Sequence, residues 1–164
     1  MLDYNMLTAW GTVAIAVVTV LGLYFTTKNA RLALGADLLF RLEGKFNGQD
    51  MKKERKEAAE HLLFRQGTES DSADEVFDFF DTVGLLVRRR VLDVEMTWSV
   101  FYYWVKGYGD AGEKYIAGKK GEYGSKTWED FEYLCHKMKK LEGRDTRMTD
   151  GEIKDFLGKE KSLA

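Results

Sequence analysis

The stretch GYGDAG, residues 107–112, is the part of the chain that most resembles a cofactor-binding motif. It matches the pattern GxGxxG, whose glycines let the backbone approach a dinucleotide phosphate at the start of a helix. That motif also requires a strand before the glycines, whereas the aromatic run WSVFYYWVK precedes them here and predicts a helix. We therefore interpret residues 107–112 as the end of a helix followed by a loop, and we predict no cofactor.

Two histidines and one cysteine, His61, His136 and Cys135, are the remaining candidates for a metal ligand or a nucleophile. A carboxylate di-iron bundle uses Glu-x-x-His, but Ala58 and Tyr133 stand three residues before the histidines. Cys135 and His136 are adjacent in the sequence. On a helix, adjacent side chains point about 100° apart, so these two would not face one metal ion. No glycine-rich elbow accompanies the cysteine. We predict no metal site and no catalytic residue, and we do not expect an enzyme.

Three consecutive arginines, Arg88, Arg89 and Arg90, follow the apolar run FFDTVGLLV. Basic residues at the end of a helix stabilise its dipole, which is one explanation of the cluster. Contact with anionic lipid headgroups is a second, and ion pairs with an acidic helix (Glu54, Glu57 or Glu60) are a third. The chain has 25 basic and 27 acidic residues. Because no broad basic surface is expected, we predict no nucleic-acid partner.

An alternative hypothesis is a membrane-tethered enzyme or effector with an unrecognised site. Its candidate residues are the carboxylates and arginine expected on facing helices, namely Glu54, Asp81, Arg88 and Glu132. Buried together, such charges would have perturbed pKa values, and perturbed pKa values mark functional sites.

Residues 6–27 carry no charge, and their length fits the roughly 20 residues that a bilayer core requires. Trp10 and Tyr24 stand near the two ends, where aromatic side chains favour the membrane interface. Lys28 and Arg31 follow the run, so the positive-inside rule places the N-terminus outside and the rest of the chain in the cytoplasm. We therefore predict an integral protein of the cell inner (plasma) membrane.

Two other features of this segment leave alternatives open. A cleaved signal peptide would begin with basic residues, but Asp3 is the charged residue before the run. Thr8, Thr12 and Ala16 have the small-xxx-small spacing that can pack two spanning helices together, so a homo-oligomer is one possible assembly.

The elements that position these residues are all expected to be helices. Proline, which breaks helix interiors, is absent, and apolar residues recur at helical spacing, including Leu34, Leu38 and Leu42. Capping signals at Ser72, Asp93 and Thr149 mark helix starts. The expected helices are residues 6–43, 51–65, 72–90, one from 93, one from 125 or 127, and one from 149. The fold class is therefore all-α, with an N-terminal transmembrane helix continuing into a small cytoplasmic bundle.

We divide the chain into a leader and span (1–27), a helical cytoplasmic domain (28–144) and a C-terminal short helix and tail (145–164). The middle part, FFDTVGLLVRRRVLDVEMTWSVFYYW followed by WEDFEYL, resembles an uncharacterised prokaryotic membrane-anchored family, domain of unknown function 4760. The residues that carry the resemblance are Phe79, Phe80, Asp81, Gly84, Leu85, Leu86, Val87, Arg88, Leu92, Asp93, Glu95, Tyr103, Trp104, Trp128, Phe131, Glu132 and Leu134. The resemblance implies one span with a helical cytoplasmic part and brings no catalytic residue. We expect a protein that acts by binding another protein, a second copy of itself or the membrane surface.

Overall fold

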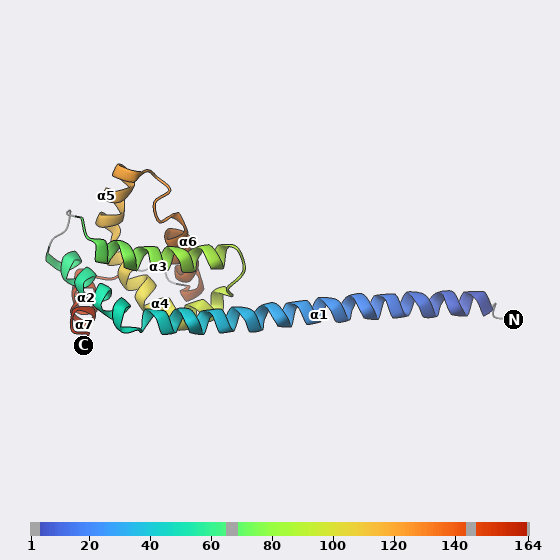
Figure 1. The fold of residues 1–164 in the computed structure, drawn as a ribbon. Helices are drawn as coiled ribbons and strands as arrows, with labels where there is room; N and C mark the ends of the chain where they lie inside the picture. Colours follow the sequence, from blue (N-terminus) through green and yellow to red (C-terminus); the bar gives the residue numbers. More distant parts are fainter. Residues whose placement is uncertain (1–3, 65–68, 144–146, 164) are drawn as a thin grey trace.

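The computed structural model describes residues 4–64, 69–143 and 147–163, with side chains described at residue 15 and from residue 17 onward. Over these residues the fold is all-α, as the sequence predicts. The helices are α1 (Tyr4–Phe46), α2 (Gln49–Phe64), α3 (Asp71–Arg88), α4 (Val94–Ala111), α5 (Glu113–Tyr123), α6 (Glu129–Glu142) and α7 (Asp150–Lys161). The helices α2 to α7 form a bundle, and α1 projects far beyond it toward the N-terminus (Figure 1).

Helix α1 is continuous from the N-terminal segment into the bundle, which confirms the predicted continuation. Its C-terminal end is anchored by Phe46, a fully buried residue whose ring lies 5.0 Å from that of Phe79 and 5.7 Å from that of Phe101. On the predicted apolar stripe, Leu38 and Leu42 pack against the core beside buried Leu39, whereas Leu34 is exposed. Only the last turns of α1 therefore pack against the domain.

Over the described residues, none of the helices combines the length and the apolar character needed to cross a membrane. The span predicted at residues 6–27 is thus without support from the structure. Of its predicted interface residues, Trp10 lies outside the side chains described, and Tyr24, Lys28 and Arg31 are exposed on α1.

Helix α3 lies at the centre of the bundle, against α2, α4 and α6. It approaches α6 so closely that a Cβ atom at Gly84 would lie 2.0 Å from the carbonyl oxygen of Asp130. Gly84 therefore permits a close crossing of α3 and α6. The predicted cap at Ser72 is wrong. Ser70 caps the helix by accepting from the N–H of Ala73, while the Ser72 hydroxyl donates to Glu57 on α2.

The largest difference from the sequence-based expectation is α5, which occupies the region predicted to be a glycine-rich loop. Its apolar residues do not recur at helical spacing, but Tyr115 and Ile116 are buried against the bundle. Tertiary packing therefore stabilises a helix that its own pattern does not announce. Helix α6 consequently begins later than predicted, after Trp128, whose backbone is left-handed (φ 53°).

Helix α7 begins with the predicted capping box of Thr149 and Glu152. Its Phe156 ring packs over Gly107, where an added Cβ atom would lie 2.4 Å from the ring. The other two glycines of GYGDAG are similarly close to Cys135 and Phe77. The predicted frayed end is thus a helix that continues to Ala111, with glycines that serve close packing.

Candidate functional site

Arg88, the first of the three arginines, is bound within the domain. Its guanidinium donates to Asp130 at 2.8 Å and to Glu129 at 3.1 Å, and it lies 5.6 Å from the centre of the Tyr133 ring. These hydrogen bonds raise the pKa of Arg88 further above its usual value. Among the described residues, Arg88 makes none of the ion pairs expected with α2, because its partner carboxylates belong to α6. Arg88 therefore joins the end of α3 to the start of α6.

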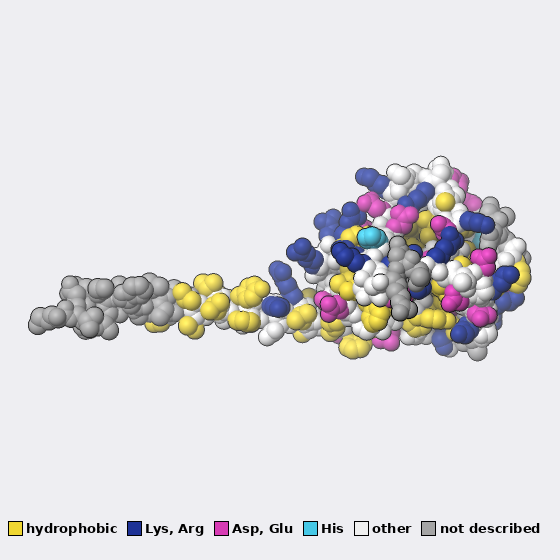
Figure 2. All heavy atoms as spheres, turned by 180° about the vertical axis from the view of Figure 1, so that it is seen from behind, with side chains coloured by type: hydrophobic (Ala, Val, Ile, Leu, Met, Phe, Trp, Pro, Cys, Tyr) yellow, Lys and Arg dark blue, Asp and Glu magenta, His cyan; other side chains and the backbone are white. Residues whose placement is uncertain are grey.

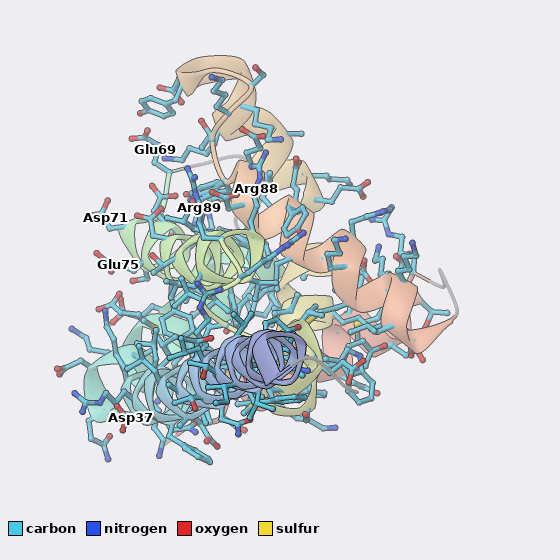
Figure 3. The ribbon with its side chains drawn as sticks, turned by 90° about the vertical axis from the view of Figure 1, so that its right-hand side faces the viewer. Asp37, Glu69, Asp71, Glu75, Arg88 and Arg89 are labelled. Carbon is cyan, nitrogen blue, oxygen red and sulfur yellow. The ribbon has the colours of Figure 1, made fainter. Side chains whose placement is uncertain are left out.

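Arg89 and Arg90 form the end of α3 and behave differently. The N–H of Arg90 donates to Val87, and that of Val91 to Leu86, which is the hydrogen-bond pattern of a Schellman motif. In this motif the residue after the cap adopts a left-handed backbone, and Arg90 does so with φ 57°. Both arginines are exposed, and over the described residues neither makes an ion pair. Figure 3 shows Arg88 and Arg89 at the end of α3 that faces the viewer, on the side from which α1 projects.

The proposed carboxylate and arginine cluster does not assemble as one site. Asp81 on α3 accepts from the backbone N–H groups of Asp130 and Phe131, and so caps α6 from a neighbouring helix. Burial raises the pKa of the Asp81 carboxyl, with the Phe131 N–H opposing the shift. Glu132 instead pairs with Lys120 on α5. Glu54, on α2, makes no hydrogen bond or ion pair with the other three over the described residues.

A buried ion pair that no sequence pattern predicted joins α2 and α7. The guanidinium of Arg55, 2% exposed, donates to both carboxylate oxygens of Glu160 at 2.7 and 2.8 Å. Glu160 also accepts from the Trp104 indole at 3.1 Å and the Tyr108 hydroxyl at 2.9 Å, while Arg55 donates to the carbonyl of Phe46. Every polar atom of the pair is thus satisfied. A lone glutamate in GKEKSLA carries no pattern from which burial could be predicted.

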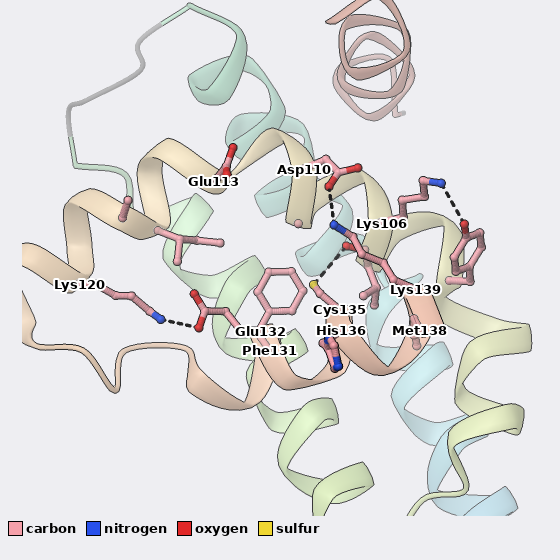
Figure 4. A pocket seen from close by; sticks show the side chains of 15 residues that line it. Lys106, Asp110, Glu113, Lys120, Phe131, Glu132, Cys135, His136, Met138 and Lys139 are labelled. Carbon is pink, nitrogen blue, oxygen red and sulfur yellow. Dashed lines mark hydrogen bonds and ion pairs between the residues drawn. The ribbon is translucent and has the colours of Figure 1, made fainter. Parts of the chain in front are cut away.

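A cavity of about 410 Å³ opens between α4, α5 and α6, with an apolar floor that includes Val105, Ile116 and Phe131 (Figure 4). Its rim carries charges of both signs, which pair with each other. Lys139 lies 3.3 Å from Asp110, and Lys120 contacts Glu132. The cavity therefore presents compensated charge rather than a field of one sign.

Cys135 and His136 both line this cavity. The sulfur of Cys135 lies 3.7 Å from the carbonyl oxygen of Val105, and burial raises the pKa of its thiol to about 12. A thiol that stays protonated at neutral pH is a poor nucleophile. His136 is exposed, whereas His61 is buried against the Tyr115 ring. Over the described residues, no group of three or more histidine, cysteine or carboxylate side chains is placed to hold a metal ion.

The sequence profile described as "Domain of unknown function (DUF4760)" matches residues 8–138. The chain belongs to the DUF4760 family. The match begins well before the stretches that carry the resemblance, residues 79–104 and 128–134, so it includes most of the apolar segment of α1, and it ends before α7. The DUF4760 profile names no activity, and it does not show that the chain is anchored in a membrane. No curated protein and no solved structure matches the chain.

Proposed function

We propose that this DUF4760 protein is a single-pass protein of the inner (plasma) membrane whose helical domain acts by binding at the cytoplasmic surface. The observation that carries the proposal is the projecting part of α1. Residues 6–27 are uncharged, and its described side chains include exposed Ile15 (70%), Val18 (70%) and Leu23 (62%). An apolar surface around a whole helix is costly in water, and a bilayer removes that cost.

The charges around this segment support the orientation. Lys28 and Arg31 follow the apolar run directly, and Asp3 precedes it. Basic residues next to a span are retained on the cytoplasmic side. The domain at the other end of α1 would then lie in the cytoplasm, within a few helical turns of the bilayer.

Surface features of the domain favour binding as its mode of action. Figure 2 shows lysine and arginine side chains gathered on the side of the domain that faces the projecting helix. Arg89 and Arg90 belong to the α3–α4 turn at this end. Apolar side chains on the membrane-distal part of α1, Leu34 and Phe40, are also about two-thirds exposed. These two surfaces suit anionic lipid headgroups and a second helical chain, respectively.

Membrane extraction tests the anchor. We expect the full chain to remain in the membrane pellet after an alkaline carbonate wash. Replacing Val18 and Leu21 by aspartate should release it, because each charge at the centre of a span costs about 2.5–3.5 kcal/mol. Leu34→Asp is the matched control on the same helix and should stay in the pellet. Extraction of the unaltered chain by carbonate would contradict the proposal.

Crosslinking in native membranes tests the binding role. We expect a self-crosslinked dimer or one reproducible partner, lost when Leu34 and Phe40 are both replaced by serine. The absence of a self-crosslink, together with the same background proteins crosslinked to the unaltered and the substituted chain, would refute binding through this surface.

A further inference from the structure

A second cavity lies beside α1, where this helix leaves the domain. It has a volume of about 380 Å³ and lies between α1, the α3–α4 turn and α6. Three basic residues from these three places line it: Arg31, Arg90 and Lys137. One acid, Asp93, also lines it, but that carboxylate already caps α4 by accepting from the N–H groups of Glu95 and Met96. The cavity therefore has an excess of positive charge, and its volume is in the range of small-molecule sites.

Helix α1 and the α3–α4 turn, which carry two of the three basic residues, pack against each other. A Cβ atom at Gly35 would lie 2.9 Å from the carbonyl oxygen of Val91, so the α3–α4 turn packs directly on α1. The Nζ atom of Lys137 lies 5.4 Å from the centre of the Tyr133 ring, and Tyr133 also lines the cavity. Leu32 and Met96 supply apolar wall. A charged headgroup joined to an acyl chain would find both kinds of surface here.

The backbone of Arg90 provides an independent reason to assign a role to its side chain. A left-handed conformation is the usual position of glycine in a Schellman motif, and most other residues are strained there. The chain nevertheless has an arginine at this position, and Arg90 is one of the residues that line the basic cavity. Strained non-glycine residues tend to occur where the side chain has a function.

The end of the cavity at Arg31 falls within the headgroup layer, and the end at Gly35 lies just beyond it. That layer is roughly 5–8 Å thick on each side of the hydrocarbon core. With a rise of about 1.5 Å per residue from Thr27, Arg31 lies roughly 6 Å beyond the core and Gly35 roughly 12 Å. The long side chain of Arg90 can extend from the turn packed at Gly35 back toward the bilayer.

We propose that the cavity lined by Arg31, Arg90 and Lys137 binds the phosphate of an anionic phospholipid headgroup from the cytoplasmic leaflet. The proposal rests on the proposed function, because it requires α1 to hold the cavity at the membrane surface. Arginine and lysine together provide charge-assisted hydrogen bonds to phosphate oxygens, and the apolar wall accepts the start of an acyl chain.

The test uses the full chain in nonionic detergent micelles, titrated with short-chain phosphatidylglycerol, phosphatidylcholine or inorganic phosphate, with bound lipid counted by native mass spectrometry. We expect saturable binding of phosphatidylglycerol and at least tenfold weaker binding of the other two. Arg31→Gln and Lys137→Gln should each weaken phosphatidylglycerol binding roughly fivefold. The controls Lys56→Gln and Lys159→Gln remove the same charge from exposed positions outside the cavity and should leave binding unchanged.

Arg90→Gly separates binding from folding. Glycine removes the backbone strain, so the melting temperature should rise by roughly 2–4 °C, while phosphatidylglycerol binding falls by fivefold or more. Unchanged binding by Arg90→Gly, or equal losses in the two lysine controls, would overturn the proposal. Inorganic phosphate that binds as tightly as phosphatidylglycerol would overturn the assignment to a lipid. The membrane anchor is judged separately by carbonate extraction, which does not depend on this cavity.

Discussion

The buried pair of Arg55 and Glu160 provides the most quantitative prediction about this fold. Glu160→Met would leave a guanidinium that is 2% exposed with one carbonyl acceptor, that of Phe46, and two aromatic faces. Removing one partner of a buried pair typically costs about 3–5 kcal/mol. The centre of the Arg55 guanidinium lies 4.1 Å from the centre of the Phe46 ring, and its contacts with this ring and with the Trp104 ring offset part of that cost. We therefore expect Glu160→Met to lower the free energy of unfolding by about 3 kcal/mol. That is a large share of the total, which is typically about 5–15 kcal/mol for a folded domain.

The reverse substitution and the double variant give the coupling between the two residues. Arg55→Met leaves Glu160 with the Trp104 and Tyr108 donors, so we also expect a loss of about 3 kcal/mol. In the double methionine variant no charge remains buried, and the loss should stay near 3 kcal/mol rather than reach their sum. The coupling energy is then about 3 kcal/mol.

Urea unfolding of the full chain in nonionic micelles, followed by circular dichroism, measures these free energies. They are comparable between variants when the dependence of the unfolding free energy on urea concentration is the same. The matched control is the exposed pair Arg41 and Asp37 on α1, whose contact of 2.9 Å is of similar length. Its coupling should be below about 0.5 kcal/mol. Single substitutions at Arg55 and Glu160 that cost less than 1 kcal/mol, or a double variant equal to their sum, would refute the reasoning.

Three further predictions concern packing and titration. Gly84→Ala should destabilise the fold by about 3 kcal/mol or more, because its Cβ meets the α6 backbone; Gly118→Ala, with open space around it, should stabilise by up to about 1 kcal/mol, and equal urea midpoints would contradict both. Burial raises the pKa of Tyr115 to about 12, so stability that is full below the unfolded pKa of about 10 should fall as pH rises toward 12. A Tyr115→Phe variant should lose less stability over that range, and a parallel pH profile would argue against this origin. The Cys135 thiol, with a pKa of about 12, should be alkylated by iodoacetamide at pH 8 more than a hundredfold slower than in the urea-unfolded chain, and similar rates would contradict its burial.

The sequence predicts the parts of this fold that depend on local patterns. The continuous helix through residue 43, the Asp93 cap of α4 and the Thr149 capping box were all expected and are present. The aromatic stripe of α3 was also recognisable, because Phe79, Phe80 and Val83 recur at helical spacing and are buried. Each of these patterns lies within a single helix, so it can be recognised from the sequence of that helix alone.

Features that depend on contacts between distant segments were not predicted. The cap of α6 comes from Asp81 on α3, so the residues around Ser125 carry no local signal of where this helix begins. The partner of Arg55 lies 105 residues further along the chain. Nor does any spacing rule place Arg31, Arg90 and Lys137 around one cavity. From the sequence, Arg88, Arg89 and Arg90 were one cluster with three possible explanations. The structure separates them: Arg88 pairs with Glu129 and Asp130, while Arg90 lines the basic cavity.

The central claim is that α1 holds the domain at a bilayer surface. The accessibility of spin labels on α1 to oxygen and to a water-soluble nickel chelate tests this claim most directly. Nitroxides would be placed singly at Leu21 and at Phe40 in a Cys135→Ser background, in the full chain reconstituted into lipid vesicles. We predict that the label at residue 21 collides with oxygen and is protected from a water-soluble nickel chelate, because oxygen concentrates in the hydrocarbon core. The label at residue 40, roughly 20 Å beyond Thr27 along the helix, should show the reverse. Equal exposure of both positions to the nickel chelate would contradict the account.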